Sequence, residues 1–281
     1  MVKTIDGKKI AEEIKQDLKK RVEIFKKKRI EPKLAIILIG ERSDCEIYAK
    51  SKQKACEEIG IKSDLHFLPE NIKEDKLIDT IDALNDDDSV HGIIVEMPLP
   101  KDLNQKIILR EISPMKDVDG LNPITIGNIS IGNEFLVPAT PKGILRLLEE
   151  MKIPIEGKEI VIVNNSNVVG KPLALLLTNR FATVTICHVK TKNLKEHTIK
   201  ADILITAVGL PNLIKKDMIK KNAIVIDAGI KRVNDKIIGD VDFDKVKDIA
   251  SYITPVPGGV GPMTVAMILE NTLIAAESLT I

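Results

Sequence analysis

Apolar positions along the chain follow two spacings, one typical of helices and one typical of buried strands. Ile10, Ile14 and Leu18 recur every four residues in a Lys/Glu-rich segment, which predicts a helix with one apolar stripe. The run LAIILIG at 34–40 is apolar throughout and ends in Gly, which indicates a buried strand. The next expected elements are a helix at 43–59, a strand at 64–68, a helix at 74–85 and a strand at 92–100. This alternation predicts an α/β fold with a parallel sheet.

The middle of the chain interrupts this alternation. Residues 114–141 are rich in Gly, Pro, Asn and Asp, which predicts an irregular and functional segment containing the crossover between two domains. A helix at 142–151 leads into the second half. Its expected elements are strands at 159–163, 183–187, 203–206 and 223–227 and a final helix from about Met263. A length of 281 residues also exceeds the comfortable size of one hydrophobic core.

Composition excludes several classes of protein. The apolar fraction is 44% and the charged fraction 30%, as in a globular chain. With 42 Lys and Arg against 41 Asp and Glu, the chain lacks the basic excess of a non-specific nucleic-acid binder, and 2% aromatic residues offer few stacking platforms. No apolar run reaches the roughly 20 residues of a membrane span, and no signal peptide is evident. Three cysteines (Cys45, Cys56 and Cys187) without CxxC spacing predict neither disulfides nor a zinc site. We therefore expect a cytoplasmic protein with no membrane or nucleic-acid partner.

One segment has the context of a phosphate-binding turn. IVIVNNSNVVGKPLALLL (160–177) predicts a buried strand, a tight polar turn and a helix, whose N-terminal N–H groups attract pyrophosphate. Only Gly170 corresponds to a glycine-rich consensus, while Asn164 and Asn165 tolerate left-handed backbone and Pro172 suits an early helical position. An ordinary βα turn capped by Asn and Ser gives the same pattern, so this motif alone leaves both interpretations open.

Two further patterns place polar groups where a ligand can meet them. Tyr48 and Lys52 lie four residues apart on one predicted helix and share a face. A phenol can stack on a flat substrate, and an ammonium supplies positive charge or, after losing its proton, a base. A partly exposed pair on an amphipathic helix is the alternative. In KDVDG (116–120), one of Asp117 and Asp119 is expected to cap the turn and the other to face a ligand; without His or Cys they do not form a metal site.

The segment PVPGGVGP at 255–262 combines rigid prolines with permissive glycines just before a helix. That combination suits close approach of the backbone to a ligand. It is equally compatible with a stiff connector.

Taken together, the motifs resemble one family. YAKSK, VEMPLP, KDVDG, PATPKG, SNVVGKP, TVTICH, ADILITAVG, VIDAGI, GDVDF and TPVPGGVGPMT occur in this order over nearly the whole length. The chain thus resembles the bifunctional methylenetetrahydrofolate dehydrogenase/cyclohydrolase family. The resemblance implies an N-terminal α/β catalytic lobe (1–138, joined by the C-terminal helix at about 263–281), a Rossmann-like NAD(P)-binding lobe (139–262) and a cleft between them. It also implies homodimers, tetrahydrofolate substrates, NADP as cofactor and no metal.

The same resemblance implies roles for particular residues. Tyr48 would stack on the folate's aminobenzoyl ring, Lys52 would be the principal catalytic residue, and Asp119 would bind the polar edge of the pterin. The remaining residues expected to line the folate pocket are Val95, Glu96, Met97, Pro98, Pro255, Gly258 and Gly259, with Glu96 also next to the chemistry. The expected cofactor contacts are Asn164, Asn165, Ser166, Val169, Gly170, Lys171, Val189, Lys190, Ala207, Val208, Gly209, Ile230 and Thr264.

One departure from the family pattern affects the catalytic lysine. Family members commonly have Gln where this chain has Glu96. A nearby carboxylate favours the protonated form of Lys52 and opposes its use as a base, unless Glu96 is itself protonated or shares the proton. Of the two activities, we expect the cyclohydrolase step to be affected more by this departure. The alternatives are therefore a monofunctional dehydrogenase with weak cyclohydrolase activity, or a non-catalytic folate- or nucleotide-binding regulator, which would not need the lysine.

Other departures affect the cofactor. The family's usual Gly-Arg-Ser is Asn164-Asn165-Ser166 here, and its Ser after Cys-His is Val189, so two expected contacts to the 2′-phosphate of NADP are missing. Lys190 or Lys192 is a candidate replacement for the charge. NADP is expected from the family, with NAD as the alternative. Ala139 replaces the family's Cys before TPKG, which argues against a required thiol there.

Overall fold

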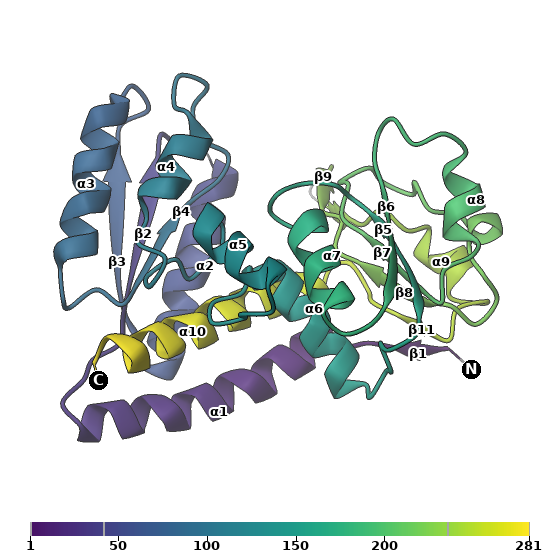
Figure 1. The fold of residues 1–281 in the computed structure, drawn as a ribbon, viewed down its shortest axis with the longest axis horizontal. Coiled ribbons are helices and arrows are strands. Elements are labelled where there is room, and N and C mark those ends of the chain that lie inside the picture. Colours follow the sequence, from purple (N-terminus) through teal and green to yellow (C-terminus); the bar gives the residue numbers. More distant parts are fainter. Residues whose placement is uncertain (1, 42, 235, 281) are drawn as a thin grey trace. The chain divides into compact units, whose positions relative to one another are not determined.

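The computed structural model describes residues 2–41, 43–234 and 236–280, and the chain divides into two compact units (Figure 1). Unit 1 comprises Met1–Glu12 and Thr140–Thr264, and unit 2 comprises Glu13–Ala139 and Val265–Ile281. The chain therefore passes between units after residues 12, 139 and 264. Helices α1 (Gly7–Lys27) and α10 (Val260–Leu279) each begin in unit 1 and continue into unit 2.

Unit 2 contains a three-stranded parallel sheet in the order β3-β2-β4. The central strand is buried from Leu34 to Ile39 because both of its faces are covered, which explains its continuous apolar sequence. One face packs Ala35 and Ile37 against Leu77 and Ile81 of a helix that follows. The elements are β2 (Lys33–Ile39), α2 (Ser43–Ile59), β3 (Lys62–Leu68), α3 (Glu74–Asp86), β4 (Gly92–Val95), α4 (Gln105–Glu111) and α5 (Pro123–Ser130).

Two expectations for this unit need correction. The strand predicted at 92–100 ends at Val95, since Pro98 and Pro100 remove the N–H groups a ladder needs. The segment predicted to be irregular at 114–141 contains α5 and the start of α6 (Ala139–Glu150). The side chain of Asn122 accepts a hydrogen bond from Ile124 N–H at the start of α5, where Pro occupies the first turn.

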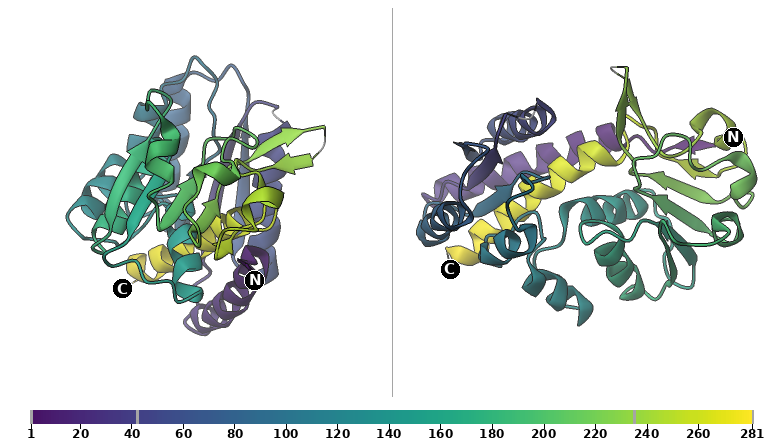
Figure 2. Two further views of the ribbon diagram at one scale, coloured as in Figure 1. Left: turned by 90° about the vertical axis from the view of Figure 1, so that its right-hand side faces the viewer. Right: turned by 90° about the horizontal axis from the view of Figure 1, so that it is seen from above.

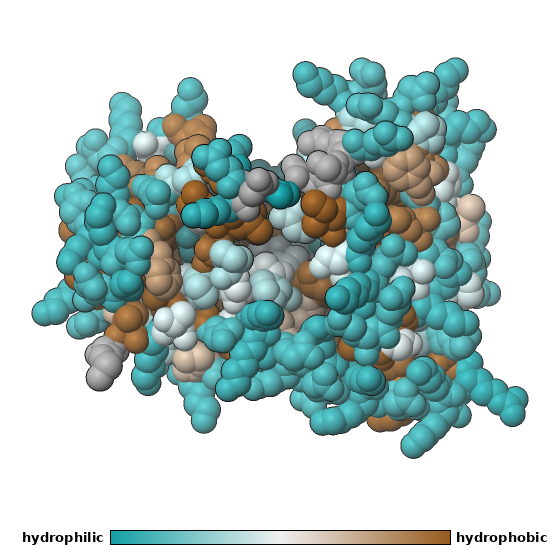
Figure 3. Space-filling model, turned by 180° about the vertical axis from the view of Figure 1, so that it is seen from behind, coloured by the Kyte–Doolittle hydropathy of each residue, from teal (hydrophilic) through white to brown (hydrophobic). Residues whose placement is uncertain are grey.

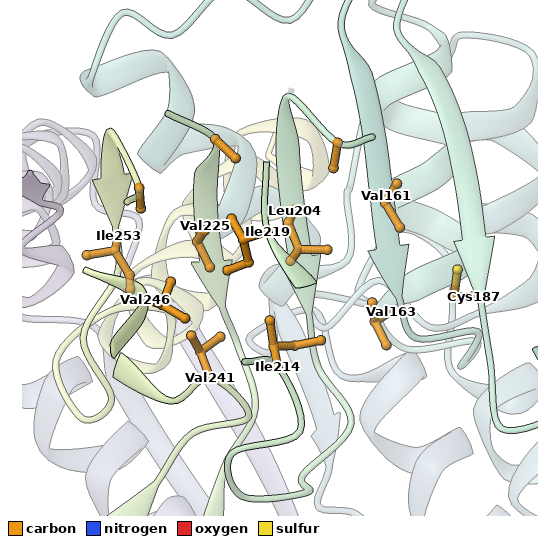
Figure 4. Packing of buried hydrophobic residues seen from close by; sticks show 13 residues of the cluster. Val161, Val163, Cys187, Leu204, Ile214, Ile219, Val225, Val241, Val246 and Ile253 are labelled. Atoms are coloured by element: carbon orange, nitrogen blue, oxygen red, sulfur yellow. The ribbon is translucent and has the colours of Figure 1, made fainter. Parts of the chain in front are cut away.

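Unit 1 contains a six-stranded sheet in the order β1-β11-β8-β7-β5-β6, all of whose strand pairs are parallel. The parallel α/β fold predicted from the sequence is therefore confirmed. Figure 4 shows one apolar cluster to which the strands contribute Val161, Leu204 and Val225, and the connections contribute Ile214 and Val241. The strands and helices are β1 (Lys3–Thr4), α6, β5 (Glu159–Val163), α7 (Gly170–Thr178), β6 (Thr183–Cys187), α8 (Leu194–Thr198), β7 (Ile203–Thr206), η1 (Lys216–Met218), β8 (Ile224–Asp227), α9 (Phe243–Val246) and β11 (Tyr252–Ile253).

Short elements complete unit 1. Strands β9 (Lys231–Val233) and β10 (Lys236–Ile238) form an antiparallel ribbon that projects from the rest of the unit (Figure 2). Strand β1 pairs with β11, and both are two residues long. Elements this short carry no periodic signal, which is why the sequence pattern did not predict them.

Helix α10 is apolar around most of its circumference and is largely buried, as expected of a core helix. Its buried Asn271 amide donates to the backbone carbonyls of Val118 and Val137, both 2.9 Å away in unit 2. Hydrophilic side chains cover most of the face seen in Figure 3. Within the described ranges, no helix combines the length and apolarity that crossing a membrane requires.

Candidate functional site

A buried ion pair joins two of the predicted residues in unit 2. Lys52 comes from the third turn of α2, and Glu96 follows the last residue of β4, where its N–H donates to Ile37 C=O. The Lys52 Nζ lies 2.5 Å from Glu96 Oε1, and the two side chains are 13% and 6% exposed. The departure from the family pattern therefore places a carboxylate directly on the lysine.

Tyr48 lies one helical turn before Lys52 and is 46% exposed, so a flat ligand can contact its ring. The thiol of Cys45 on the same helix donates to Met97 C=O at 3.6 Å, which joins α2 to the segment after β4. Val95 differs from the other residues predicted to line the folate pocket, because its side chain packs in the apolar cluster that includes Ile37 and Leu77. Pro98 is exposed.

The structure distinguishes the two aspartates of KDVDG. The Asp117 carboxylate accepts hydrogen bonds from the N–H groups of Gly120, Leu121 and Asn122 and from Thr125 Oγ1, at 2.7–3.1 Å. Asp117 is therefore the turn cap, and the sequence could not tell which of the pair it would be.

Asp119 has the other role. Burial raises the pKa of its carboxyl to about 6; Lys52 opposes that rise, while Asp117 and Glu96 add to it. Within the described ranges its carboxylate accepts no hydrogen bond, in contrast to that of Asp117. Lys52, Glu96 and Asp119 thus form one electrostatic cluster, with Asp119 able to accept hydrogen bonds from a ligand.

In unit 1, the turn between β5 and α7 is organised by Asn164. Its Oδ1 accepts from the N–H and hydroxyl of Ser166 and from Gly170 N–H at 2.7–2.9 Å, and its Nδ2 donates to Ala207 C=O at 2.5 Å. A Cβ at Gly170 would lie 2.0 Å from the Asn164 carbonyl oxygen, so only glycine fits. The expectation of left-handed backbone at Asn164 and Asn165 is wrong: neither has positive φ. Asn164 acts through its side chain instead.

The other residues predicted to contact a cofactor follow the carboxyl ends of the same sheet. Val163, the last residue of β5, pairs with Cys187, the last residue of β6. Asn165 and Val189 each follow two residues after this pair, and Val189 is 88% exposed. Gly209, with φ of 76°, follows β7. Three of the remaining residues make polar contacts: Val169 N–H donates to Ser166 Oγ, Lys171 Nζ donates to Asn167 Oδ1, and the Thr264 hydroxyl is 3.0 Å from that of Thr140. Lys190, Lys192 and Ile230 are exposed, and Val208 is half-buried.

The Pro/Gly-rich segment before α10 is packed against the start of α1. Gly258 has φ of 105° and its carbonyl accepts from Lys8 N–H at 2.9 Å. A Cβ at Gly7 would lie 2.0 Å from the carbonyl oxygen of Gly259, and one at Gly259 would lie 2.5 Å from that of Pro255. The segment therefore makes close backbone contacts within unit 1.

Sequence reasoning missed two buried carboxylates in unit 1. Asp227 and Asp240 bind the loops that follow β7 and β8. The signal was present in the motifs VIDAGI and GDVDF, but nothing in their spacing indicated that the two side chains meet.

Unit 1 has the architecture of a Rossmann-like dinucleotide-binding domain. Its strands are parallel, and the turn after β7 at their carboxyl edge contains the small residues Ala207 and Gly209, which leave the backbone accessible to a bound pyrophosphate. These residues fit a dinucleotide. The structure thus defines a dinucleotide-dependent protein with a second α/β unit that contains a lysine–carboxylate cluster.

Comparison with known proteins identifies the family. The profile for the tetrahydrofolate dehydrogenase/cyclohydrolase catalytic domain matches residues 5–119, and that for the NAD(P)-binding domain of the same enzymes matches residues 138–280. The chain belongs to the tetrahydrofolate dehydrogenase/cyclohydrolase family.

Individual relatives agree with this assignment over nearly their whole length. The bifunctional protein FolD of Exiguobacterium sibiricum is 50% identical over 277 residues, which are 99% of this chain and 100% of the relative. The crystal structure of the FolD methylenetetrahydrofolate dehydrogenase/cyclohydrolase from Campylobacter jejuni is 48% identical with a TM-score of 0.98, covering 99% of each chain. The Trypanosoma brucei enzyme, solved with NADP and an inhibitor, is 35% identical with a TM-score of 0.95, covering 99% of this chain and 98% of that one.

Proposed function

We propose that this chain oxidises 5,10-methylenetetrahydrofolate to 5,10-methenyltetrahydrofolate with NADP⁺ and then hydrolyses the product to 10-formyltetrahydrofolate. These are linked reactions of one-carbon metabolism. The observation that carries the proposal is the cluster of Lys52, Glu96 and Asp119 in a chain of this family. Residues 1–138 with the final helix hold the folate in this proposal, and residues 139–262 hold the dinucleotide.

The folate is bound by groups of unit 2. The exposed ring of Tyr48 stacks on the aminobenzoyl ring, and the Asp119 carboxylate accepts hydrogen bonds from the pterin N–H groups. Met97 and Pro98 supply a wall after β4. Because Val95 packs in the core, it contributes through its backbone.

The oxidation depends mainly on alignment. The nicotinamide ring supplies the hydride acceptor when NADP is bound. The methylene carbon of the folate lies between two nitrogens, whose lone pairs stabilise the cation left behind. The protein's part is to hold the folate carbon in the reactive geometry and to hold the dinucleotide on the turns at Gly170 and Gly209.

The hydrolysis needs proton transfer at Lys52. Water adds to the methenyl carbon and gives up a proton to neutral Lys52, and a proton then reaches N5 as its bond to that carbon breaks. One proton is released overall. The Glu96 carboxylate lies 2.5 Å from the Lys52 Nζ, so a negative charge sits next to the group that transfers the proton.

That ion pair also favours a second candidate, a dehydrogenase with weak cyclohydrolase activity. The two are distinguished in one spectrophotometric experiment with methylenetetrahydrofolate and NADP⁺. Formation of NADPH reports the oxidation, and loss of methenyl absorbance reports the hydrolysis. If both signals are seen, the main proposal is supported. If NADPH forms while the methenyl absorbance persists, the second candidate is supported. If no signal is seen, both candidates are contradicted and a non-catalytic binding protein is indicated.

A further inference from the structure

The carboxylate of Asp240 organises the loop that follows β7. The side chain is fully buried, and it accepts hydrogen bonds from Thr206 Oγ1 at 2.7 Å, Val208 N–H at 2.6 Å and Leu210 N–H at 2.8 Å. Thr206 is the last residue of β7, so the three donors span the end of the strand and the start of the loop. This one side chain therefore fixes the path of the backbone through Ala207, Val208 and Gly209.

Asp227, the last residue of β8, fixes Asp240 in turn. Its carboxylate accepts from the N–H groups of Gly229, Asp240 and Val241 at 2.9–3.1 Å. The Asp227 carboxylate thus fixes the backbone of Asp240, whose own carboxylate fixes the loop after β7. Both lie in motifs, VIDAGI and GDVDF, for which the catalytic proposal gives no role.

Glycines make room for both carboxylates. A Cβ at Gly229 would lie 2.2 Å from Asp240 Cγ, and a Cβ at Gly239 would lie 2.1 Å from Asp227 Oδ2. Any larger residue at either position would push a carboxylate out of place. An ionised carboxylate is an acceptor at both oxygens, whereas an amide would turn its NH₂ toward one of the N–H donors.

We propose that Asp240 is a positioning residue for the dinucleotide and that Asp227 supports it. This inference rests on the proposed function, in which the Ala207–Gly209 loop contacts NADP. Asp240 acts through the loop, because the hydrogen bonds to Thr206, Val208 and Leu210 occupy both of its oxygens.

The test compares Asp240→Asn with Asp242→Asn, in direct titrations with NADPH followed by its fluorescence. Asp242 is two residues away and pairs with Lys245 at the surface at 2.9 Å, so its variant makes the same chemical change outside the loop. We expect Asp240→Asn to raise the Kd for NADPH about tenfold, the effect of one unsatisfied buried donor, with the KM for the folate changed less than about twofold. Asp242→Asn should bind NADPH as the parent does.

A second pair of variants separates positioning from packing. Thr206→Ser keeps the hydroxyl donor and loses a methyl group, whereas Thr206→Val keeps the shape and loses the donor. A positioning role requires Thr206→Val to weaken NADPH binding more than Thr206→Ser. This pair decides the question if Asp240→Asn does not fold.

Parental NADPH affinity in a folded Asp240→Asn protein would overturn the inference, as would equal weakening by the two Thr206 variants. A rise in the folate KM as large as that in the NADPH Kd would also overturn it, because it would indicate a general loss of structure. If the parent binds NADPH but does not oxidise methylenetetrahydrofolate, the proposed function fails while this inference still stands on the binding data.

Discussion

The Lys52 ammonium and the Glu96 carboxylate lie 2.5 Å apart, on side chains that are 13% and 6% exposed. Water screens such a pair poorly, so each charge strongly favours the other. Removing either charge leaves the other buried without its partner.

Glu96→Gln should raise cyclohydrolase activity near neutral pH. The amide keeps the shape of the side chain and removes the negative charge that lies 2.5 Å from the Lys52 Nζ. The oxidation should change less, since it depends on alignment. Profiles of both half-reactions check this, with Glu46→Gln as the control, because Glu46 pairs with Lys50 on the exposed side of the same helix. An unmoved cyclohydrolase profile would show that the two groups are uncoupled, and a fall in both activities would assign Glu96 to orienting Lys52 or the pterin.

Lys52→Met should fold but lose cyclohydrolase activity, with a smaller loss of dehydrogenase activity. It leaves Glu96 buried without its partner, which lowers the free energy of unfolding by about 3 kcal/mol. The double variant Lys52→Met/Glu96→Gln should recover part of that stability and none of the hydrolysis. Lys50→Met is the matched control, since the Lys50 side chain is 64% exposed. Hydrolysis of methenyltetrahydrofolate at the parental rate by Lys52→Met would refute the assigned role.

The two aspartates of KDVDG should respond oppositely to amide substitution. The pKa of Asp119 is about 6 in the folded state against 3.8 ordinarily, so the folded protein takes up a proton more readily than the unfolded chain between these values. The parent's unfolding free energy therefore falls as the pH rises through this range. Asp119→Asn should stabilise the protein by about 2 kcal/mol above pH 6, and the gain should vanish below about pH 4. It should also weaken folate binding.

Asp117→Asn should instead destabilise the protein by about 2 kcal/mol or more, because an amide cannot satisfy all four donors that surround the carboxylate. Urea unfolding of both variants at several pH values provides the measurement. Stabilisation by Asp117→Asn would mean that its hydrogen bonds do not offset the burial of the charge.

Asn165→Arg should shift cofactor preference toward NADP. Asn165 is exposed two residues beyond β5, and an arginine there adds a charge-assisted contact to the 2′-phosphate. The parent should tolerate NAD better than relatives that have Arg and Ser at the positions of Asn165 and Val189. Parallel titrations with both cofactors decide this. Strong NADP selectivity in the parent, unchanged by Lys190→Ala and Lys192→Ala, would mean that another group binds the phosphate.

Gly170→Ala should destabilise unit 1 and weaken NADPH binding, because its Cβ would lie 2.0 Å from the Asn164 carbonyl oxygen. Gly127→Ala is the matched control: Gly127 is on α5, and beyond the neighbouring residues and the backbone of that helix no atom lies within 4 Å of the added Cβ. That change should be stabilising by up to about 1 kcal/mol through helix propensity. Urea unfolding and NADPH titration of both variants test the contrast, and equal stability of the two would contradict it.

Much of the fold could be predicted because the buried strands are continuous apolar runs. The predicted bounds of β5, β6 and β7 match those observed, since each is a short run rich in Ile, Val and Thr, residues that favour strands. Helix α5 was missed because Asn122 and Pro123, which start it, also begin turns. The strands β1 and β11 were missed because their stability comes from pairing across distant parts of the chain.

The candidate site was less predictable for the same reason. Lys52 and Glu96 are 44 residues apart in sequence, so their contact depends on how α2 packs against the sheet. The roles of Asp117 and Asp119 depend on which carboxylate the following N–H groups reach, and composition does not determine that. The side-chain role of Asn164 was missed because its propensity for left-handed backbone suggested a different function.

The hydrogen bonds from Asn271 join parts of unit 2 that are synthesised far apart in time. Its amide donates to the carbonyls of Val118 and Val137, and residues 140–264 are all translated between those carbonyls and that amide. Unit 1 therefore has all its residues before unit 2 does, although most of unit 2 leaves the ribosome first. A nascent chain that has reached Thr264 has all the residues of unit 1, while unit 2 still lacks the part of α10 that contains Asn271.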